Sequence, residues 1–130
     1  MKYREEIEKT IEILPENIGA FLSTGLRCVE AGENGLAYIR FIGAIEMIIN
    51  PILKESKVTF GRKINELSKD KKYADLAGEM LDMEIVNTRN SIVHEVISEE
   101  NKKKDLESLC SYLFGKGKLI ELYNRVEKNR

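Results

Sequence analysis

The residues best equipped for chemistry lie in the six-residue segment 89–94, of sequence RNSIVH, which holds the only histidine of the chain. Histidine can both take and give a proton near neutral pH. Arginine stays charged, and its planar fork of donors suits phosphate oxygens. Arg89 and His94 together therefore have the groups needed to move a proton and hold a phosphodiester.

The spacing of these two residues constrains how they can act together. Residues five apart point about 140° away from each other on a regular helix, whereas residues four apart share a face. Asn90 and His94 are four apart, and Arg89 and His94 are five apart. One chain therefore aims Arg89 and His94 at one point only if the helix distorts, but a twofold pairing of two such helices brings both faces into one cleft.

The composition indicates one soluble domain that covers residues 1–130. A chain of 130 residues has the size of a typical single domain, and it is 42% hydrophobic and 33% charged. The 21 basic and 22 acidic residues give a formal net charge of −1, so the whole molecule has no electrostatic footprint for nucleic acid. Any contact with RNA must come from a local patch.

Apolar residues recur at intervals of three and four along the whole chain, and no β-hairpin signal appears. We expect an all-α fold, an up-and-down bundle of four main helices plus a short connecting helix. The expected helical segments are 3–31 with a break before Pro15, a central apolar helix over 36–50, a short helix over 60–67 capped by Thr59, one helix over 73–94, and a last helix from Lys102, weakened at Gly115 and Gly117.

The central apolar segment contains two polar exceptions, Glu46 and Asn50, which are four apart and so share a face. Two interpretations stay open. Either this face is an exposed seam, or Glu46 faces the site and orients Arg89 or His94.

The remaining features favour a cytoplasmic protein without a metal or cofactor. Cys28 and Cys110 lie in apolar helical patterns, as buried free thiols in a reducing compartment do, and two cysteines with one histidine do not readily complete a zinc site. The N-terminus is charged and lacks the apolar core of a signal peptide. The longest apolar stretch is interrupted by Arg40, Glu46 and Asn50, which argues against a membrane span.

The segment Arg89 to His94 resembles the signature of the HEPN domains, small all-helical proteins with an arginine, a polar residue and then, a few positions later, a histidine. Here Arg89 is followed by the polar Asn90, and His94 comes four positions after Asn90. The all-α pattern and the segment Phe60 to Ile64, which looks like the short connecting helix of these domains, strengthen the resemblance. In architecture the resemblance covers residues 18–126, but in motif only six residues.

The resemblance implies a metal-independent endoribonuclease that acts as a homodimer, with two copies of the motif at the interface. In that case the RNA 2′-hydroxyl attacks the adjacent phosphorus, a step that DNA lacks. Arg89 and His94 would be the catalytic residues, with His94 transferring protons and Arg89 stabilising charge on the phosphoryl oxygens. Asn90 would bind the substrate or position His94, and a protein antitoxin is a possible partner.

This sequence also departs from part of the family. Some members are paired with a nucleotidyltransferase antitoxin and carry a modified tyrosine two positions after the histidine, where this chain has Val96. Other HEPN domains are inactive dimerisation or nucleotide-binding modules. In such a module His94 would cap or fill an interhelical contact, and Arg89 would form an ion pair with Glu84, Glu95 or a neighbouring helix.

Overall fold

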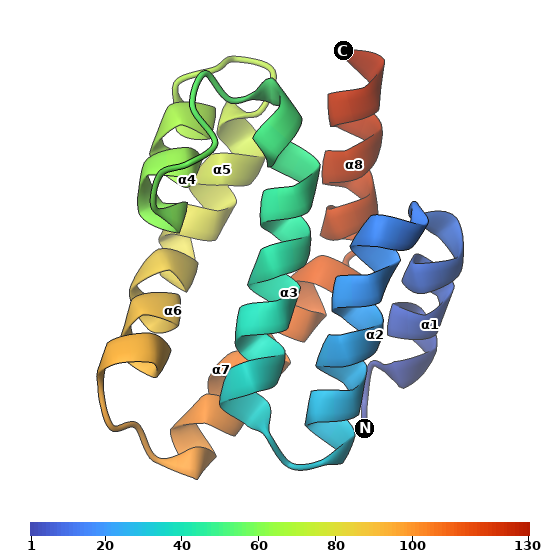
Figure 1. The fold of residues 1–130 in the computed structure, drawn as a ribbon, viewed down its shortest axis with the longest axis vertical. Helices are drawn as coiled ribbons and strands as arrows, with labels where there is room; N and C mark the ends of the chain where they lie inside the picture. The colour runs from blue at the N-terminus through green and yellow to red at the C-terminus, as the bar shows by residue number, and fades with distance from the viewer.

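The computed structural model describes residues 1–130, and every regular element in it is helical (Figure 1). The all-α prediction is confirmed. The eight α-helices are α1 (Arg4–Ile13), α2 (Glu16–Glu30), α3 (Asn34–Ile49), α4 (Phe60–Ser68), α5 (Ala74–Asp82), α6 (Ile85–His94), α7 (Glu99–Cys110) and α8 (Lys118–Lys128). A 3-10 turn, Asn50–Ile52, follows α3, and a π-helical segment, Ser111–Gly115, joins α7 to α8.

Helix α3 is the centre of the molecule, as the sequence predicts. It runs through the middle of the fold with α1 and α2 on one side and α4 to α6 on the other (Figure 1). Half of its sixteen residues are buried, among them Tyr38, Phe41 and Ile45. The stretch Asn34–Ile52 is long and apolar enough to cross a membrane by length and composition, and half of it is buried inside this fold, as in the core helix of a bundle.

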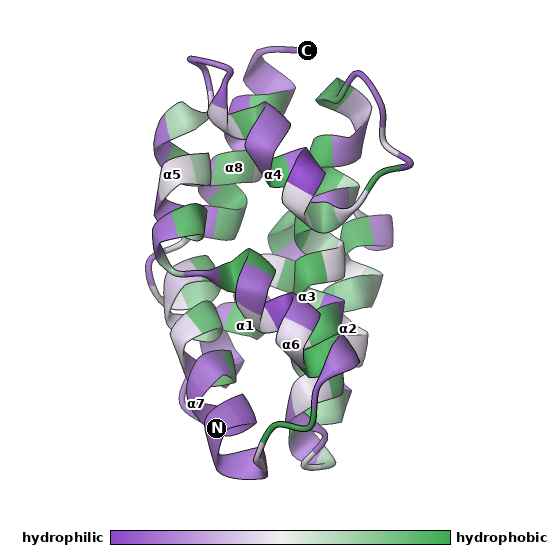
Figure 2. Ribbon diagram, turned by 90° about the vertical axis from the view of Figure 1, so that its left-hand side faces the viewer, coloured by the Kyte–Doolittle hydropathy of each residue, from purple (hydrophilic) through white to green (hydrophobic).

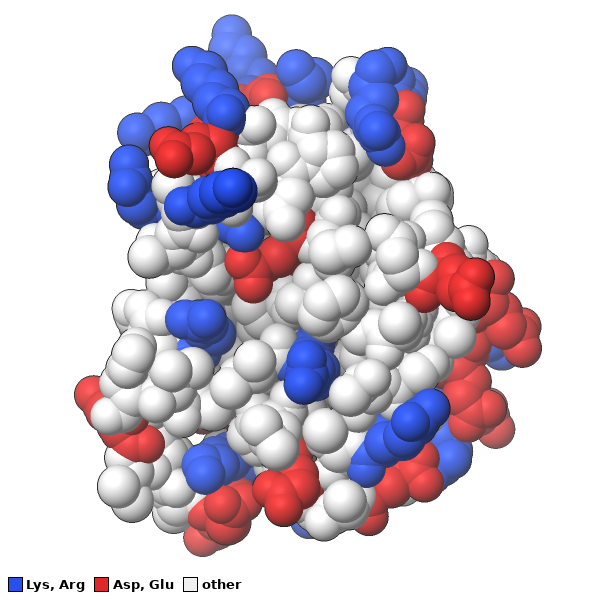
Figure 3. Space-filling model, in the orientation of Figure 1, with Lys and Arg blue, Asp and Glu red and all other residues white.

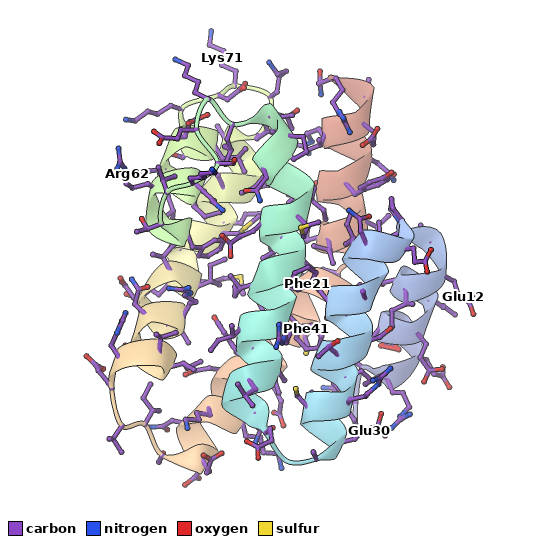
Figure 4. The ribbon with its side chains drawn as sticks, viewed as in Figure 1. Glu12, Phe21, Glu30, Phe41, Arg62 and Lys71 are labelled. Carbon is purple, nitrogen blue, oxygen red and sulfur yellow. The ribbon has the colours of Figure 1, made fainter.

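Helices α2 and α3 pack closely because each presents a glycine to a phenylalanine of the other. The ring of Phe41 lies against Gly25, where a Cβ atom would come within 2.4 Å of it. The ring of Phe21 lies in the same way against Gly43, at 2.7 Å from the position of a Cβ atom. Figure 4 shows both rings at the junction of the two helices. Phe41 also contacts Phe114 edge to face, with ring centroids 5.2 Å apart, so the contact reaches the π-helical segment.

The site-bearing part of the chain departs from the predicted single helix over 73–94. The helix is broken between α5 and α6, where Glu84 adopts the left-handed conformation with φ of 58°. The apolar spacing continues across the break, and neither glycine nor proline marks it, so periodicity alone extends the helix too far. The expected count of four main helices and one short helix is therefore too low.

Other helix boundaries follow local capping chemistry. Thr59 caps α4 as predicted, its Oγ1 accepting a hydrogen bond from the Arg62 amide at 3.3 Å. Pro15 directly precedes α2 and separates it from α1. The predicted start of the last segment at Lys102 is too late, because Ser98 caps α7 by accepting a hydrogen bond from the Asn101 amide at 3.2 Å.

Hydrophobic and hydrophilic residues alternate along the helices (Figure 2), and nearly all of the buried residues are hydrophobic. These hydrophobic residues form one core of 30 buried residues drawn from the length of the chain. Cys110 belongs to this core, and burial raises the pKa of its thiol to about 12, so the thiol stays protonated at neutral pH. The expectation of burial is confirmed for Cys110, whereas Cys28 is partly exposed; neither cysteine forms a disulfide.

The space around two glycines predicts opposite effects on stability when each is replaced by alanine. Gly25→Ala should lower the free energy of unfolding by about 2–3 kcal/mol, because the new methyl group overlaps the buried Phe41 ring. Gly78→Ala, inside α5 with no atom near its Cβ position, should instead raise it by about 0.5–1 kcal/mol through helix propensity. Urea denaturation measures both, and equal effects of the two substitutions would contradict the close packing.

Candidate functional site

The candidate residues lie on α6, which is attached to the rest of the fold along one side. Ile85 is its only buried residue. Thr88 lies beside Tyr38 of α3, and burial raises the pKa of the Tyr38 hydroxyl. Near the end of α6, Ile92 lies against Gly35 at the start of α3. These contacts hold α6 against α3, and Val86 packs against Gly61 of α4.

Arg89 has an unusual hydrogen-bond environment. Its Nη1 donates to Asn90 Oδ1 at 3.3 Å, whereas its Nε is buried and has no partner. No carboxylate lies within ion-pair distance, so the expected alternative of an ion pair with Glu84, Glu95 or a neighbouring helix is wrong. A buried donor without a partner is costly and rare in folded proteins. No carboxylate of this chain neutralises the Arg89 guanidinium, whereas its buried Nε is not accessible to a ligand.

His94 is the last residue of α6 and is exposed. Its side chain makes no hydrogen bond within the chain. His94 therefore neither caps an interhelical contact through a hydrogen bond nor fills one. The imidazole is accessible to a ligand or to a second protein molecule.

The structure does not bring Arg89 and His94 together within one chain. Because α6 is a regular α-helix through both residues, they point about 140° apart, and the distortion that would join them is absent. Asn90 does lie beside Arg89 through their hydrogen bond. Asn90 and His94 are exposed and four residues apart, so they share one polar face with Asn87.

Glu46 takes neither of its two expected roles. Its Oε2 accepts a hydrogen bond from Nζ of Lys63 in α4 at 2.7 Å, so it neither orients Arg89 or His94 nor stands on an exposed seam. The Lys63 side chain is only 6% exposed and that of Glu46 26%. The sequence holds a signal for this pair, because Lys63 falls in the apolar spacing of Phe60, Ile64 and Leu67.

The pair predicts a strong dependence of stability on Glu46. Glu46→Ala should lower the free energy of unfolding by about 3 kcal/mol, because the buried Lys63 ammonium loses its partner. The double variant Glu46→Leu with Lys63→Met should recover most of the loss. Glu127→Ala, which removes an exposed pair with Arg130, is the control and should change stability by about 0.5 kcal/mol or less. A double variant as unstable as Glu46→Ala would refute this account.

No group of three or more His, Cys, Asp or Glu residues is arranged to hold a metal ion. Comparisons with protein-family models, with curated proteins and with solved structures found no match. The geometry of α6 and the short motif that it carries are therefore the basis for assigning a function.

Proposed function

We propose that the protein is a metal-independent endoribonuclease of toxin or phage-defence type that acts in the cytoplasm as a HEPN-like homodimer. The observation that carries this proposal is the state of the motif residues. The Arg89 guanidinium has no carboxylate partner and donates only to the side chain of the adjacent Asn90, and His94 is exposed on the same regular helix. These are the groups that a phosphodiester cleaved by its own 2′-hydroxyl needs.

In the proposed reaction the 2′-oxygen of the RNA bonds to the adjacent phosphorus and the bond from phosphorus to the 5′-oxygen breaks. His94 removes the proton of the attacking hydroxyl or protonates the leaving oxygen. The Arg89 guanidinium stabilises the negative charge that builds on the phosphoryl oxygens. Asn90 holds Arg89 through its Oδ1 and faces the substrate beside His94. The products carry a 2′,3′-cyclic phosphate and a 5′-hydroxyl.

A dimer supplies the geometry that one chain lacks. In the proposed cleft, Arg89 of one copy acts with His94 of its partner, because the two residues of one copy point apart. Exposed apolar side chains near His94 support an interface there: Val93 is 45% exposed and Val96 fully exposed. Figure 2 shows hydrophobic colour in the connection between α6 and α7, where Val96 lies. An antitoxin protein would act by covering this face.

One observation favours a second function, that of a non-catalytic dimerisation or nucleotide-binding module. The main hollows on the surface of a single chain are not lined by Arg89, Asn90 or His94. In the first proposal the dimer forms the cleft; in the second the same face only binds a partner. Cleavage assays separate the two.

Purified protein in EDTA should cut single-stranded RNA, and His94→Ala should reduce the rate about 10²–10⁴-fold because a proton-transfer group is lost. Arg89→Ala should reduce it about 10²–10³-fold. An oligonucleotide of the same sequence with 2′-deoxyribose should stay intact. Gel electrophoresis of end-labelled RNA measures all three rates. RNA that stays intact with the wild-type protein would instead support the non-catalytic module, and cleavage by His94→Ala at the wild-type rate would refute the role of His94.

Co-expression of the Arg89→Ala and His94→Ala chains tests whether the cleft is shared between copies. Random pairing makes about half of the dimers mixed, and each mixed dimer has one cleft with both residues intact. The mixture should therefore regain about a quarter of the wild-type rate. A site formed within one chain would regain none, because every chain then carries one defect. Size-exclusion chromatography with light scattering confirms that both variants remain dimers.

A further inference from the structure

The positive charge of this near-neutral protein is concentrated at one end. Residues 54–72 contain seven basic and three acidic residues, a formal charge of +4, so the rest of the chain carries −5 of the total of −1. This segment forms α4 and its two flanking connections. Figure 3 shows Lys and Arg gathered at this upper end of the molecule, and Figure 4 shows Arg62 and Lys71 projecting from it.

Most of these cations are free to bind a ligand. Two are paired within the fold, Lys63 with Glu46 and Lys72 with Asp70. The other five are exposed and have no carboxylate within ion-pair distance; we call them the basic end, and they are Lys54, Lys57, Arg62, Lys69 and Lys71.

The carboxylates of this segment do not cancel that charge. Glu66 is engaged by the Lys54 amide, which donates to its Oε2 at 2.9 Å, and Asp70 accepts from the Lys72 amide at 3.0 Å. Glu55 is the one acidic side chain of the segment without a partner. The basic end therefore keeps a net positive field at the surface.

Three adjoining surface hollows connect the basic end to α6. The first, of about 590 Å³, and the second, of about 420 Å³, share Lys54, Glu66 and Lys69 in their linings. The second shares Arg62 and Asn65 with a third hollow of about 340 Å³.

The third hollow ends at α6. It is lined by Glu84, Val86 and Asn87, and Asn87 begins the polar face that continues through Asn90 to His94. The distance from Asn87 to His94 along the helix is about 10 Å. One path along the surface thus runs from the basic end through the three hollows to His94.

We infer that the basic end binds the phosphate backbone of a single-stranded RNA and that the three hollows lead this strand to His94. The inference rests on the proposed ribonuclease function and adds to it a substrate-binding surface remote from the reacting phosphate. The exposed ammonium and guanidinium groups neutralise phosphates in place of condensed counterions. Asn65 and Asn87 supply amide groups for sugar and phosphate oxygens along the path.

The linings favour phosphates over an acidic protein partner. Interfaces between proteins centre on buried apolar and aromatic anchors. None of the three hollows is lined by an aromatic residue, and the second has Val58 as its one apolar residue. Without aromatic side chains for base stacking, the surface reads the backbone rather than the bases, so binding is insensitive to sequence and strongly dependent on salt.

Binding is tested in the His94→Ala background, so that the RNA stays intact. The probe is a fluorescein-labelled oligouridylate of about 20 nucleotides, followed by anisotropy over a series of salt concentrations. Lys69→Gln with Lys71→Gln should weaken binding about ten-fold at low salt, and it should reduce the slope of log K against log salt by about 1.4, or 0.7 per lysine. Lys9→Gln with Lys116→Gln, the control of equal charge, should bind as the parent does.

Cleavage assays with His94 intact complete the test. Lys69→Gln with Lys71→Gln should raise KM for the 20-mer and leave kcat, and the cleavage of a dinucleotide, unchanged. Equal effects of the control pair and the test pair on RNA binding would overturn the inference, as would competition by polyglutamate as effective as that by RNA, which would assign the surface to an acidic protein. Salt-sensitive binding by the wild type without cleavage would uphold the binding surface and refute the ribonuclease instead.

Discussion

The other elements depend on the packing between α2 and α3, in which a phenylalanine of each helix lies against a glycine of the other. It fixes the two helices at close approach, which leaves α3 as a rigid central support. Along this support, Ile92 of α6 packs against Gly35, Thr88 lies beside Tyr38, and Glu46 holds α4 through Lys63. The candidate motif and the basic end are therefore positioned by contacts to the same helix. A shift of α3 would move both together.

The ion pairs of the molecule differ in how much they contribute to stability. The ion pair between Lys63 and Glu46 is largely buried. Removal of one partner therefore leaves an unpaired buried charge and lowers the free energy of unfolding. Arg125 instead binds the exposed Asp75 and the Lys72 carbonyl, tying α8 to the turn before α5. This hydrogen bond lowers the pKa of the Asp75 carboxyl. Exposed pairs of this kind add little stability, but they fix the position of the turn beside the basic end.

The sequence predicts the features that depend on local chemistry and apolar spacing. The central helix, the proline break before α2 and the Thr59 cap are all visible in the residue pattern, and the structure confirms them. The break at Glu84 is not visible in the sequence. Nothing in the residue pattern indicates that this glutamate adopts a left-handed backbone conformation, and the apolar spacing continues past it. Neither role predicted for Glu46 includes Lys63, because a helical pattern shows which face a residue occupies and not which element packs there. The positions of Arg89 and His94 on α6 follow from their spacing, whereas the relation between two copies depends on surface fit, which no pattern within one chain encodes.

The shallow attachment of α6 has a consequence for how this protein can diversify. A helix with one buried residue, Ile85, places few demands on its outward side chains. Substitutions there escape the packing penalties that restrict α3, so the chemistry of the exposed face can drift while the scaffold is conserved. Related chains with the same framework and quite different surface residues on this helix are the evolutionary pattern that such an architecture permits.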